Sequence, residues 1–86
     1  MNYRLEYLES VVRRDIPKLS KPIRDRIRTE IERKLATNPV EFGKPLQYSL
    51  KGCRRLRVGD YRLVYLIEND SVLIVKIGHR KEIYER

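Results

Sequence analysis

The chain has 86 residues, enough for one small domain with a modest core, so residues 1–86 are treated as a single domain. Twenty Lys and Arg residues against 12 acidic ones give a net charge of +8, which points to nucleic acid, an anionic membrane or an acidic protein as partner. One Cys and one His exclude an internal disulfide and argue against a structural zinc site.

The first half of the chain is predicted to form one short strand and two helices. Residues 3–7 alternate apolar with polar side chains, as in a half-buried strand. Apolar residues then recur every three or four positions over residues 8–19, which predicts a helix that breaks or kinks where Ile16 precedes Pro17. A second helix is predicted over residues 20–35, with Ser20 as its cap or Pro22 in its first turn. The tight turn between the helices predicts an antiparallel helical pair.

The second half is predicted to form a three-stranded antiparallel meander. Residues 39–52 contain two Gly and two Pro residues and are expected to form an ordered connecting loop. Three strands follow, over residues 53–58, 61–67 and 72–77. The fold class is therefore α+β: a short N-terminal strand, a two-helix antiparallel hairpin and a three-stranded meander, which together form one mainly antiparallel sheet.

The most informative stretch is the first hairpin, in which Gly59-Asp60 separates two alternating segments. Gly at the first central position suits a two-residue type II′ turn, which pairs Arg57 with Arg62. Strand alternation then places Arg55, Arg57 and Arg62 on one face of the sheet. Like charges directly opposite each other cost about 0.2–1 kcal/mol, so fold stability alone does not favour this arrangement. We expect an anion as its counterpart, and a solvated face is the alternative.

The second hairpin turns at Asn69-Asp70. A loop of two or four residues pairs Tyr65 with Ile74 and Arg62 with Ile77. On this register the arginine face continues into the apolar residues Val64, Leu66, Leu73, Val75 and Ile77. The helices cover only one face, so an exposed apolar remainder on the other would be a candidate protein-binding surface.

The tail brings a further cation and a phenol toward this face. Arg80 follows the last strand, and Tyr84 comes four residues later, so both point the same way if the segment forms a helical turn. His79 adjoins Arg80, and in an extended segment the two side chains would face opposite ways.

Several short motifs together resemble the RelE toxins of the RelE/ParE superfamily. In order along nearly the whole chain they are Lys44-Pro45-Leu46, Leu50-Lys51-Gly52, Leu56–Arg62, Val64-Tyr65 and Ile77–Tyr84. The resemblance implies a RelE-like fold and the toxin of a bacterial or archaeal type II toxin–antitoxin pair, which enters the ribosomal A site and cleaves the mRNA there. It also implies an endoribonuclease that needs no metal and no small-molecule cofactor.

The resemblance also assigns roles to residues by position. Arg55, Arg62 and Arg80 fall where the family has catalytic basic residues, and Tyr84 falls at its C-terminal tyrosine. The candidate RNA-binding residues are Lys51, Arg54, Arg57, His79 and Lys81. One further family lysine falls at Cys53, which cannot carry that charge, so a neighbouring cation among Lys51, Arg54 and Arg57 would have to take its role.

The residue types fit RNA cleavage without a metal. The neighbouring 2′-OH attacks the scissile phosphate in line, which leaves a 2′,3′-cyclic phosphate and a 5′-OH. Planar guanidiniums stabilise the charge that develops on the phosphorane oxygens. Tyr84 is the candidate base because nearby arginines favour its phenolate, and stacking on a nucleobase or closing the core is its alternative role. His79 is the other candidate for proton transfer.

Two other functions remain open. A ParE-like poison of DNA gyrase shares the fold and the hairpin motif, and a non-catalytic nucleic-acid-binding module would use the arginines only to hold phosphates. The tail arginine and tyrosine favour the ribonuclease. Its expected partners are an acidic RelB-like antitoxin and the ribosome with its mRNA and rRNA. No apolar run is long enough for a signal peptide or a membrane span, so we expect a cytoplasmic protein.

Overall fold

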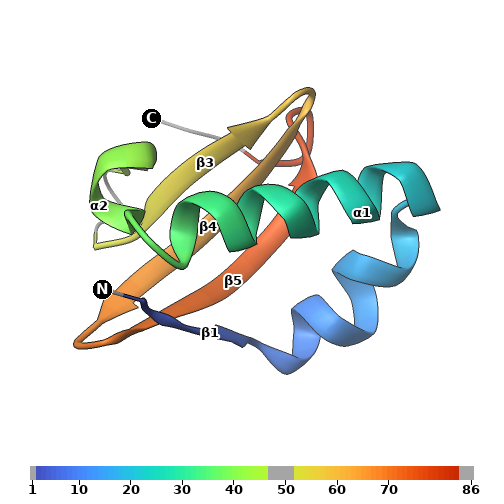
Figure 1. The fold of residues 1–86 in the computed structure, drawn as a ribbon. Helices are drawn as coiled ribbons and strands as arrows, with labels where there is room; N and C mark the ends of the chain where they lie inside the picture. The colour runs from blue at the N-terminus through green and yellow to red at the C-terminus, as the bar shows by residue number, and fades with distance from the viewer. Residues whose placement is uncertain (1, 47–51, 84–86) are drawn as a thin grey trace.

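A computed structural model of the chain describes residues 2–46 and 52–83 and shows a single sheet with its helices on one face (Figure 1). The first half contains β1 (Arg4–Tyr7), the short helical segments η1 (Val11–Asp15) and η2 (Ile16–Lys18), α1 (Lys21–Glu30), η3 (Ile31–Leu35) and α2 (Pro39–Phe42). The second half contains β2 (Lys44–Pro45), β3 (Arg54–Val58), β4 (Tyr61–Glu68) and β5 (Ser71–His79).

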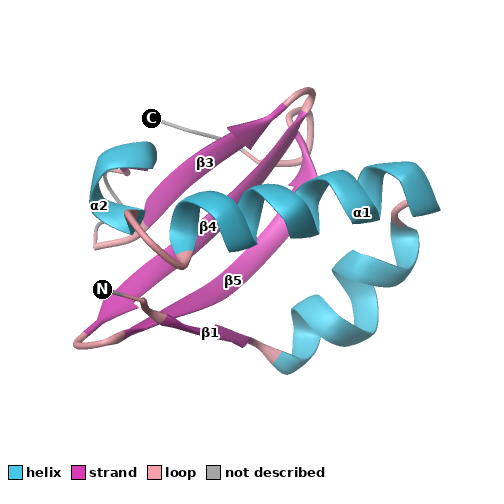
Figure 2. Cartoon of the chain, in the orientation of Figure 1, coloured by secondary structure: helices cyan, strands magenta, loops and turns pink. Residues whose placement is uncertain are grey.

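The strands form one sheet in the order β1-β5-β4-β3-β2 (Figure 2). β1 runs parallel to β5, and the other three neighbouring pairs are antiparallel. The predicted α+β class and the mainly antiparallel sheet are therefore confirmed.

The helical layer follows the predicted pattern with two local changes, because η1 and η3 both have turns wider than those of an α-helix. In η1 the turn is wider than in an α-helix, because the N–H of Ile16 donates to the carbonyl of Val11, five residues back. The chain then tightens into η2 at Pro17, so the predicted break is confirmed. Pro22 lies in the first turn of α1, where its missing N–H costs no helical hydrogen bond.

The main core lies between the sheet and this helical layer. Amphipathic spacing directs Ile27, Ile31 and Leu35 toward the sheet, where each is at most 3% exposed. They pack on the apolar side chains that alternate with the arginines along the strands. The buried cluster comprises Val11, Leu19, Ile27, Ile31, Leu35, Leu56, Val58, Leu63, Tyr65, Val72, Ile74 and Ile77.

The first hairpin has the predicted register. Arg57 faces Arg62, and Arg55 faces Val64. Gly59 adopts a φ of 62°, which an L side chain rarely adopts and which a glycine at the first turn position supplies.

The second hairpin departs from the predicted register. Tyr65 faces Ile74 as expected, but Val64 faces Lys76, so Val75 is an extra residue in β5. As a result Arg62 faces Gly78, and the predicted pairing of Arg62 with Ile77 is wrong. Ile77 packs in the core on the helix side, and its predicted place on the arginine face is wrong too.

The connector is more structured than the loop that was predicted. It contains α2 and β2, and β2 pairs Lys44 with Arg55 at the edge of the sheet. Tyr65 of the central strand holds α2, since its hydroxyl donates to the carbonyl of Pro39 at 2.6 Å. Burial raises the pKa of the Tyr65 phenol, while a hydrogen bond with Arg54 acts in the opposite direction.

Gly43 is the position where this arrangement leaves least room. A Cβ at this residue would overlap the Tyr65 hydroxyl, with ring carbon Cζ only 2.7 Å away. We expect Gly43→Ala to lower the free energy of unfolding by about 1–3 kcal/mol, because a fully buried ring must move. Chemical denaturation followed by circular dichroism measures this change. Gly52→Ala is not a suitable control, because Gly52 has a φ of 97°. The control is Ser10→Ala, at an exposed position whose side chain makes no capping hydrogen bond, and a similar loss there would contradict the explanation.

Candidate active site

Three arginines share the face of the sheet that points away from the helices. Leu56 and Val58 of β3 pack in the helix-side core, so Arg55 and Arg57, which alternate with them, lie on the opposite face. Arg62 lies directly across from Arg57 on β4. The predicted cluster of Arg55, Arg57 and Arg62, called the arginine face below, is thus assembled as the sequence indicated.

The three side chains differ in their access to solvent. Arg57 is exposed, Arg55 is partly buried, and Arg62 is only 8% exposed. The Nη1 atom of Arg62 donates to the carbonyls of Gly59 and Tyr61 at 3.2 and 3.1 Å. Arg62 therefore secures the turn of the hairpin while it adds positive charge beside Arg57.

Arg80 is delivered to the same turn by the chain after β5. Its N–H donates to the carbonyl of Asp60 at 2.8 Å, and its Nε lies 3.9 Å from the Asp60 carboxylate. The Arg80 side chain remains 58% exposed, so it is available to a ligand. Asp60 was not singled out from the sequence, where only its place in the turn was used.

The last described residues fold back over the arginine face. The Glu82 carboxylate accepts the N–H of His79 at 2.9 Å, and the Glu82 N–H donates to the His79 carbonyl at 2.8 Å. Ile83 is then buried against Leu46 and Val64. This second cluster covers part of the apolar surface that was expected to remain exposed on this face.

Other predicted RNA-binding residues lie elsewhere. The Arg54 guanidinium donates to the carbonyls of Val40 and Gly43, both at 2.6 Å, and so secures α2. The His79 ring lies edge-on to Tyr61, 5.4 Å between centroids, on the helix side of the sheet. Its Nδ1 atom accepts the N–H of exposed Lys81 at 3.2 Å. The structure therefore does not bring Arg54 and His79 to the arginine face.

Two predicted site residues, Lys51 and Tyr84, lie outside the described residues. A cation that was not singled out from the sequence, Arg26, also lies at the hairpin turn. A Cβ at Gly59 would be 2.8 Å from Nη1 of Arg26 in α1, so this guanidinium packs against the turn. No local signal in the sequence relates Arg26 to Gly59.

Cys53, which falls at a basic position of the RelE pattern, lies in an apolar setting. It packs against the cluster formed by Leu46, Val64 and Ile83. Burial raises the pKa of its thiol. A charged side chain in this environment would lose hydration, so the neutral residue matches its neighbours.

We expect the Cys53 thiol to react slowly at neutral pH. Because a raised pKa lowers the fraction of thiolate, alkylation by iodoacetamide at pH 7.5 should be slower in the folded protein than in guanidinium chloride. The folded protein should also reach its half-maximal rate at a higher pH than the unfolded chain. Mass spectrometry at timed intervals measures both rates, and equal rates in the two states would contradict this expectation.

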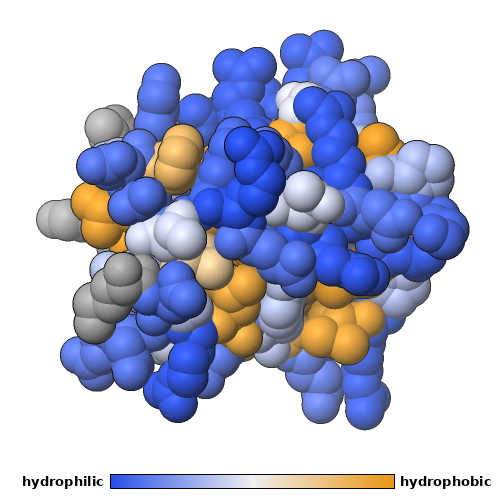
Figure 3. Space-filling model, in the orientation of Figure 1, coloured by the Kyte–Doolittle hydropathy of each residue, from blue (hydrophilic) through white to orange (hydrophobic). Residues whose placement is uncertain are grey.

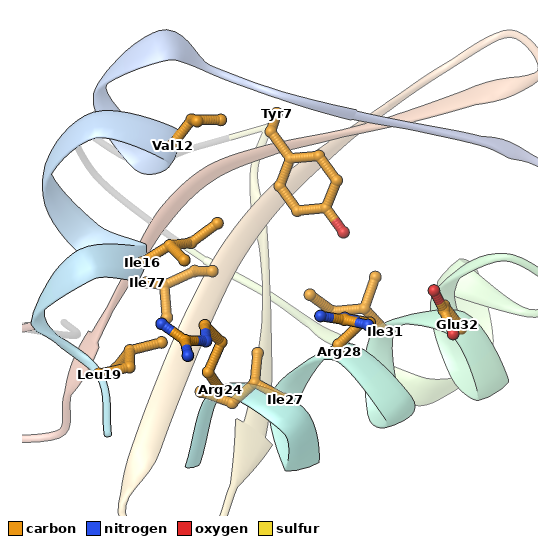
Figure 4. A pocket seen from close by; sticks show the side chains of 10 residues that line it. All are labelled: Tyr7, Val12, Ile16, Leu19, Arg24, Ile27, Arg28, Ile31, Glu32 and Ile77. Carbon is orange, nitrogen blue, oxygen red and sulfur yellow. The ribbon is translucent and has the colours of Figure 1, made fainter. Parts of the chain in front are cut away.

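A hollow lies on the other side of the sheet. It has a volume of about 420 Å³ and is lined mainly by apolar side chains from β1, η1, η2, α1, η3 and β5 (Figure 4). Burial is the main cause that raises the pKa of the Tyr7 phenol there, with Glu32 adding to it and Arg28 opposing it. Hydrophilic side chains cover most of the surrounding helical face (Figure 3). This hollow is separate from the arginine face.

Within residues 2–46 and 52–83, no three His, Cys, Asp or Glu side chains lie close enough together to hold a metal ion. No helix in those ranges is long and apolar enough to cross a membrane. The charged groups of the arginine face are guanidiniums, which bind phosphate oxygens through paired N–H groups. Together the fold and this face define a small basic domain suited to a polyanionic ligand.

Comparison with known proteins shows which family this basic domain belongs to. The family profile described as the ParE toxin of the type II toxin–antitoxin system parDE matches residues 7–84. The toxin RelG of Mycobacterium tuberculosis is 35% identical over 79 residues, which cover 90% of this chain and 91% of RelG. The chain belongs to the RelE/ParE superfamily and is a type II toxin of the RelE family.

Solved structures agree with this assignment. The crystal structure of the toxin–antitoxin complex RelBE2 from Mycobacterium tuberculosis matches with a TM-score of 0.86 and 32% identity, over 93% of each chain. The RelB–RelE antitoxin–toxin complex of Methanococcus jannaschii matches with a TM-score of 0.73 and 26% identity, over 92% of this chain and 94% of the other.

Proposed function

We propose that the protein is a ribosome-dependent mRNA interferase, which cleaves mRNA in the ribosomal A site by attack of a 2′-OH on the scissile phosphate. The observation that carries this proposal is the convergence of Arg57, Arg62 and Arg80 at one hairpin turn. Arg57 and Arg62 face each other across the ladder, and Asp60 holds Arg80 beside them. Guanidiniums gathered in this way can bind the oxygens of a phosphate through paired N–H groups.

The exposure of these side chains suggests a division of roles. Arg57 and Arg80 are accessible, so they would contact the phosphate backbone, with Arg80 at the oxygens that become more negative in the transition state. Arg55 and Arg62 lie deeper, where they would strengthen the positive potential, and Arg62 also holds the hairpin turn. Tyr84 would act as the base that accepts the proton of the attacking 2′-OH, by its resemblance to the family's C-terminal tyrosine.

The proposed physiological partner is an acidic RelB-like antitoxin. The solved relatives from Mycobacterium tuberculosis and Methanococcus jannaschii are toxin–antitoxin complexes. The net charge of +8 would attract an acidic segment as readily as RNA. An antitoxin that covers the arginine face would therefore block access of RNA to it.

Programmed ribosomes test the proposed reaction. Purified protein is incubated with ribosomes carrying a defined mRNA, and the mRNA ends are mapped and their terminal phosphates identified. Cuts in the A-site codon that leave 2′,3′-cyclic phosphates are the expected result. Intact mRNA would overturn the proposal. A parallel supercoiling assay would then separate a ParE-like gyrase poison, which inhibits the reaction, from a non-catalytic binding module, which does not.

A further inference from the structure

β5 pairs with β4 along one edge, and its other edge pairs with β1 along only the first half of the strand. β1 pairs with residues 71–74, and the last backbone bond on this edge joins the N–H of Leu8 to the carbonyl of Ile74 at 3.0 Å. Beyond Ile74, no strand in the described part of the chain pairs with this edge. The edge amides of residues 75–79 need other acceptors, because an unbonded buried N–H is costly.

Two carboxylates supply these acceptors. Asp15, at the end of η1, accepts the N–H of Ile77 at 2.9 Å, and its other oxygen lies 3.4 Å from Nζ of Lys76. Asp15 is only 6% exposed, and a carboxylate is seldom buried to this extent unless its oxygens are bonded. Glu82 accepts the N–H of His79. Asp15 thus joins the helical layer to the part of β5 that leads to Arg80.

Asp15 contacts Lys76 and Ile77, the two residues that follow the extra residue Val75 in β5. Because Val75 is extra, each later residue of the strand lies on the opposite face from the one that a regular ladder would give it. Ile77 therefore enters the core and Gly78 faces Arg62. A Cβ at Gly78 would point toward Glu82 and Ile83, whose Oε1 and Cδ1 atoms lie 3.3 and 3.5 Å away.

The same change of face determines whether His79 or Arg80 lies on the side of the sheet that carries the arginines. His79 pairs with Tyr61 on the helix side, and Arg80 comes next, bonded to Asp60. In a regular ladder His79 would take the arginine side and Arg80 the helix side. The bulge therefore selects Arg80 rather than His79 for the proposed site.

We propose that Asp15 is a positioning residue for Arg80. By holding the Ile77 amide next to the bulge, its carboxylate keeps the end of β5 in the register that directs Arg80 to the arginine face. The burial of Ile77 favours the same register, so the role of Asp15 is to hold the strand end in place rather than to determine the fold. The inference rests on the proposed function, in which Arg80 contacts the reacting phosphate.

The first test compares three variants in the programmed-ribosome assay. Asp15→Ala removes the acceptor and should lower kcat about 10- to 100-fold, with a smaller change in KM, because a displacement of about 1 Å at a reacting group has an effect of this size. Asp15→Asn retains an acceptor oxygen and should stay within a few-fold of the wild type. Lys76→Met removes only the ion pair and should also stay within a few-fold. Equal losses in Asp15→Ala and Asp15→Asn would overturn the proposal.

The second test measures the strand directly and does not depend on RNA cleavage. Amide hydrogen exchange by NMR should accelerate about tenfold or more at residues 77–80 in Asp15→Ala, while the amides between β3 and β4 remain protected. Unchanged exchange at residues 77–80 would overturn the inference even if the wild type cleaves mRNA. A wild type without cleavage but with this exchange pattern in Asp15→Ala would instead overturn the proposed function.

A stability control separates positioning from general destabilisation. Ile31→Val removes one methyl group from the core of the helical layer, where Ile31 is 1% exposed. This variant should unfold at a lower denaturant concentration and still cleave at the wild-type rate under native conditions. A loss of cleavage in Ile31→Val that matches the loss in Asp15→Ala would show that stability alone explains the effect.

Discussion

Replacing Tyr84 by Phe is expected to slow mRNA cleavage on programmed ribosomes about 10²–10⁴-fold, the usual effect of losing a general acid or base. The described chain ends at Ile83, which is 8% exposed and packs with Leu46 and Val64 beside the arginines. The residue before Tyr84 is thus anchored on the arginine face. Positive charge near a phenol favours its phenolate, which would let it accept a proton near neutral pH.

A second tyrosine provides the control for this substitution. Tyr3 is partly buried against the helix-side core, so Tyr3→Phe also removes one hydroxyl but should leave cleavage unchanged. Thermal unfolding should give similar midpoints for Tyr84→Phe and the wild type. If Tyr84→Phe cleaved at the wild-type rate, Tyr84 would have no part in proton transfer, and a role in stacking or packing would remain.

Local pattern was sufficient to predict the arginine face. The turn at Gly59-Asp60 sets the pairing of Arg57 with Arg62, and strand alternation adds Arg55 to the same side. Both rules involve residues near one another in sequence. The RelE-like motifs added Arg80, and the structure places it at the same turn through Asp60.

The features that were missed all depend on contacts between distant parts of the chain. The extra residue Val75 follows no alternation rule, and the amide of Ile77, two residues further on, is held by Asp15, 62 positions away. Arg54 was assigned to RNA because of its charge. Its actual partners are backbone carbonyls of Val40 and Gly43, which no side-chain pattern reveals.

The displaced register has a consequence for the assignment of the proton-transfer residue. His79 has a side chain suited to proton transfer near neutral pH. The bulge turns it toward Tyr61 and the core side, and its Nδ1 atom accepts a backbone N–H from the following turn. This geometry argues against His79 as the proton-transfer residue, and the proposal of Tyr84 rests on its match to the family's C-terminal tyrosine.

Arg80→Ala is expected to reduce cleavage about 10²–10³-fold, because it removes a donor to the charge that develops in the transition state. The fold should remain intact. The Arg80 side chain is 58% exposed, and its 3.9 Å ion pair with Asp60 lies in solvent, so its contribution to stability is small. The backbone bond to Asp60 survives the substitution. Arg80→Lys should recover only part of the rate, since an ammonium cannot bind two phosphate oxygens in the planar manner of a guanidinium.

Arg13 offers a closely matched control. Its side chain is 75% exposed, and its Nε also lies 3.9 Å from a carboxylate, that of Glu9. Arg13→Ala therefore removes the same charge and the same kind of ion pair, but from η1 on the helix side of the sheet. Single-turnover cleavage at two salt concentrations distinguishes the two explanations. A loss confined to Arg80→Ala and maintained at low salt supports a direct role at the phosphate, whereas equal losses in both variants would show that only the net charge matters.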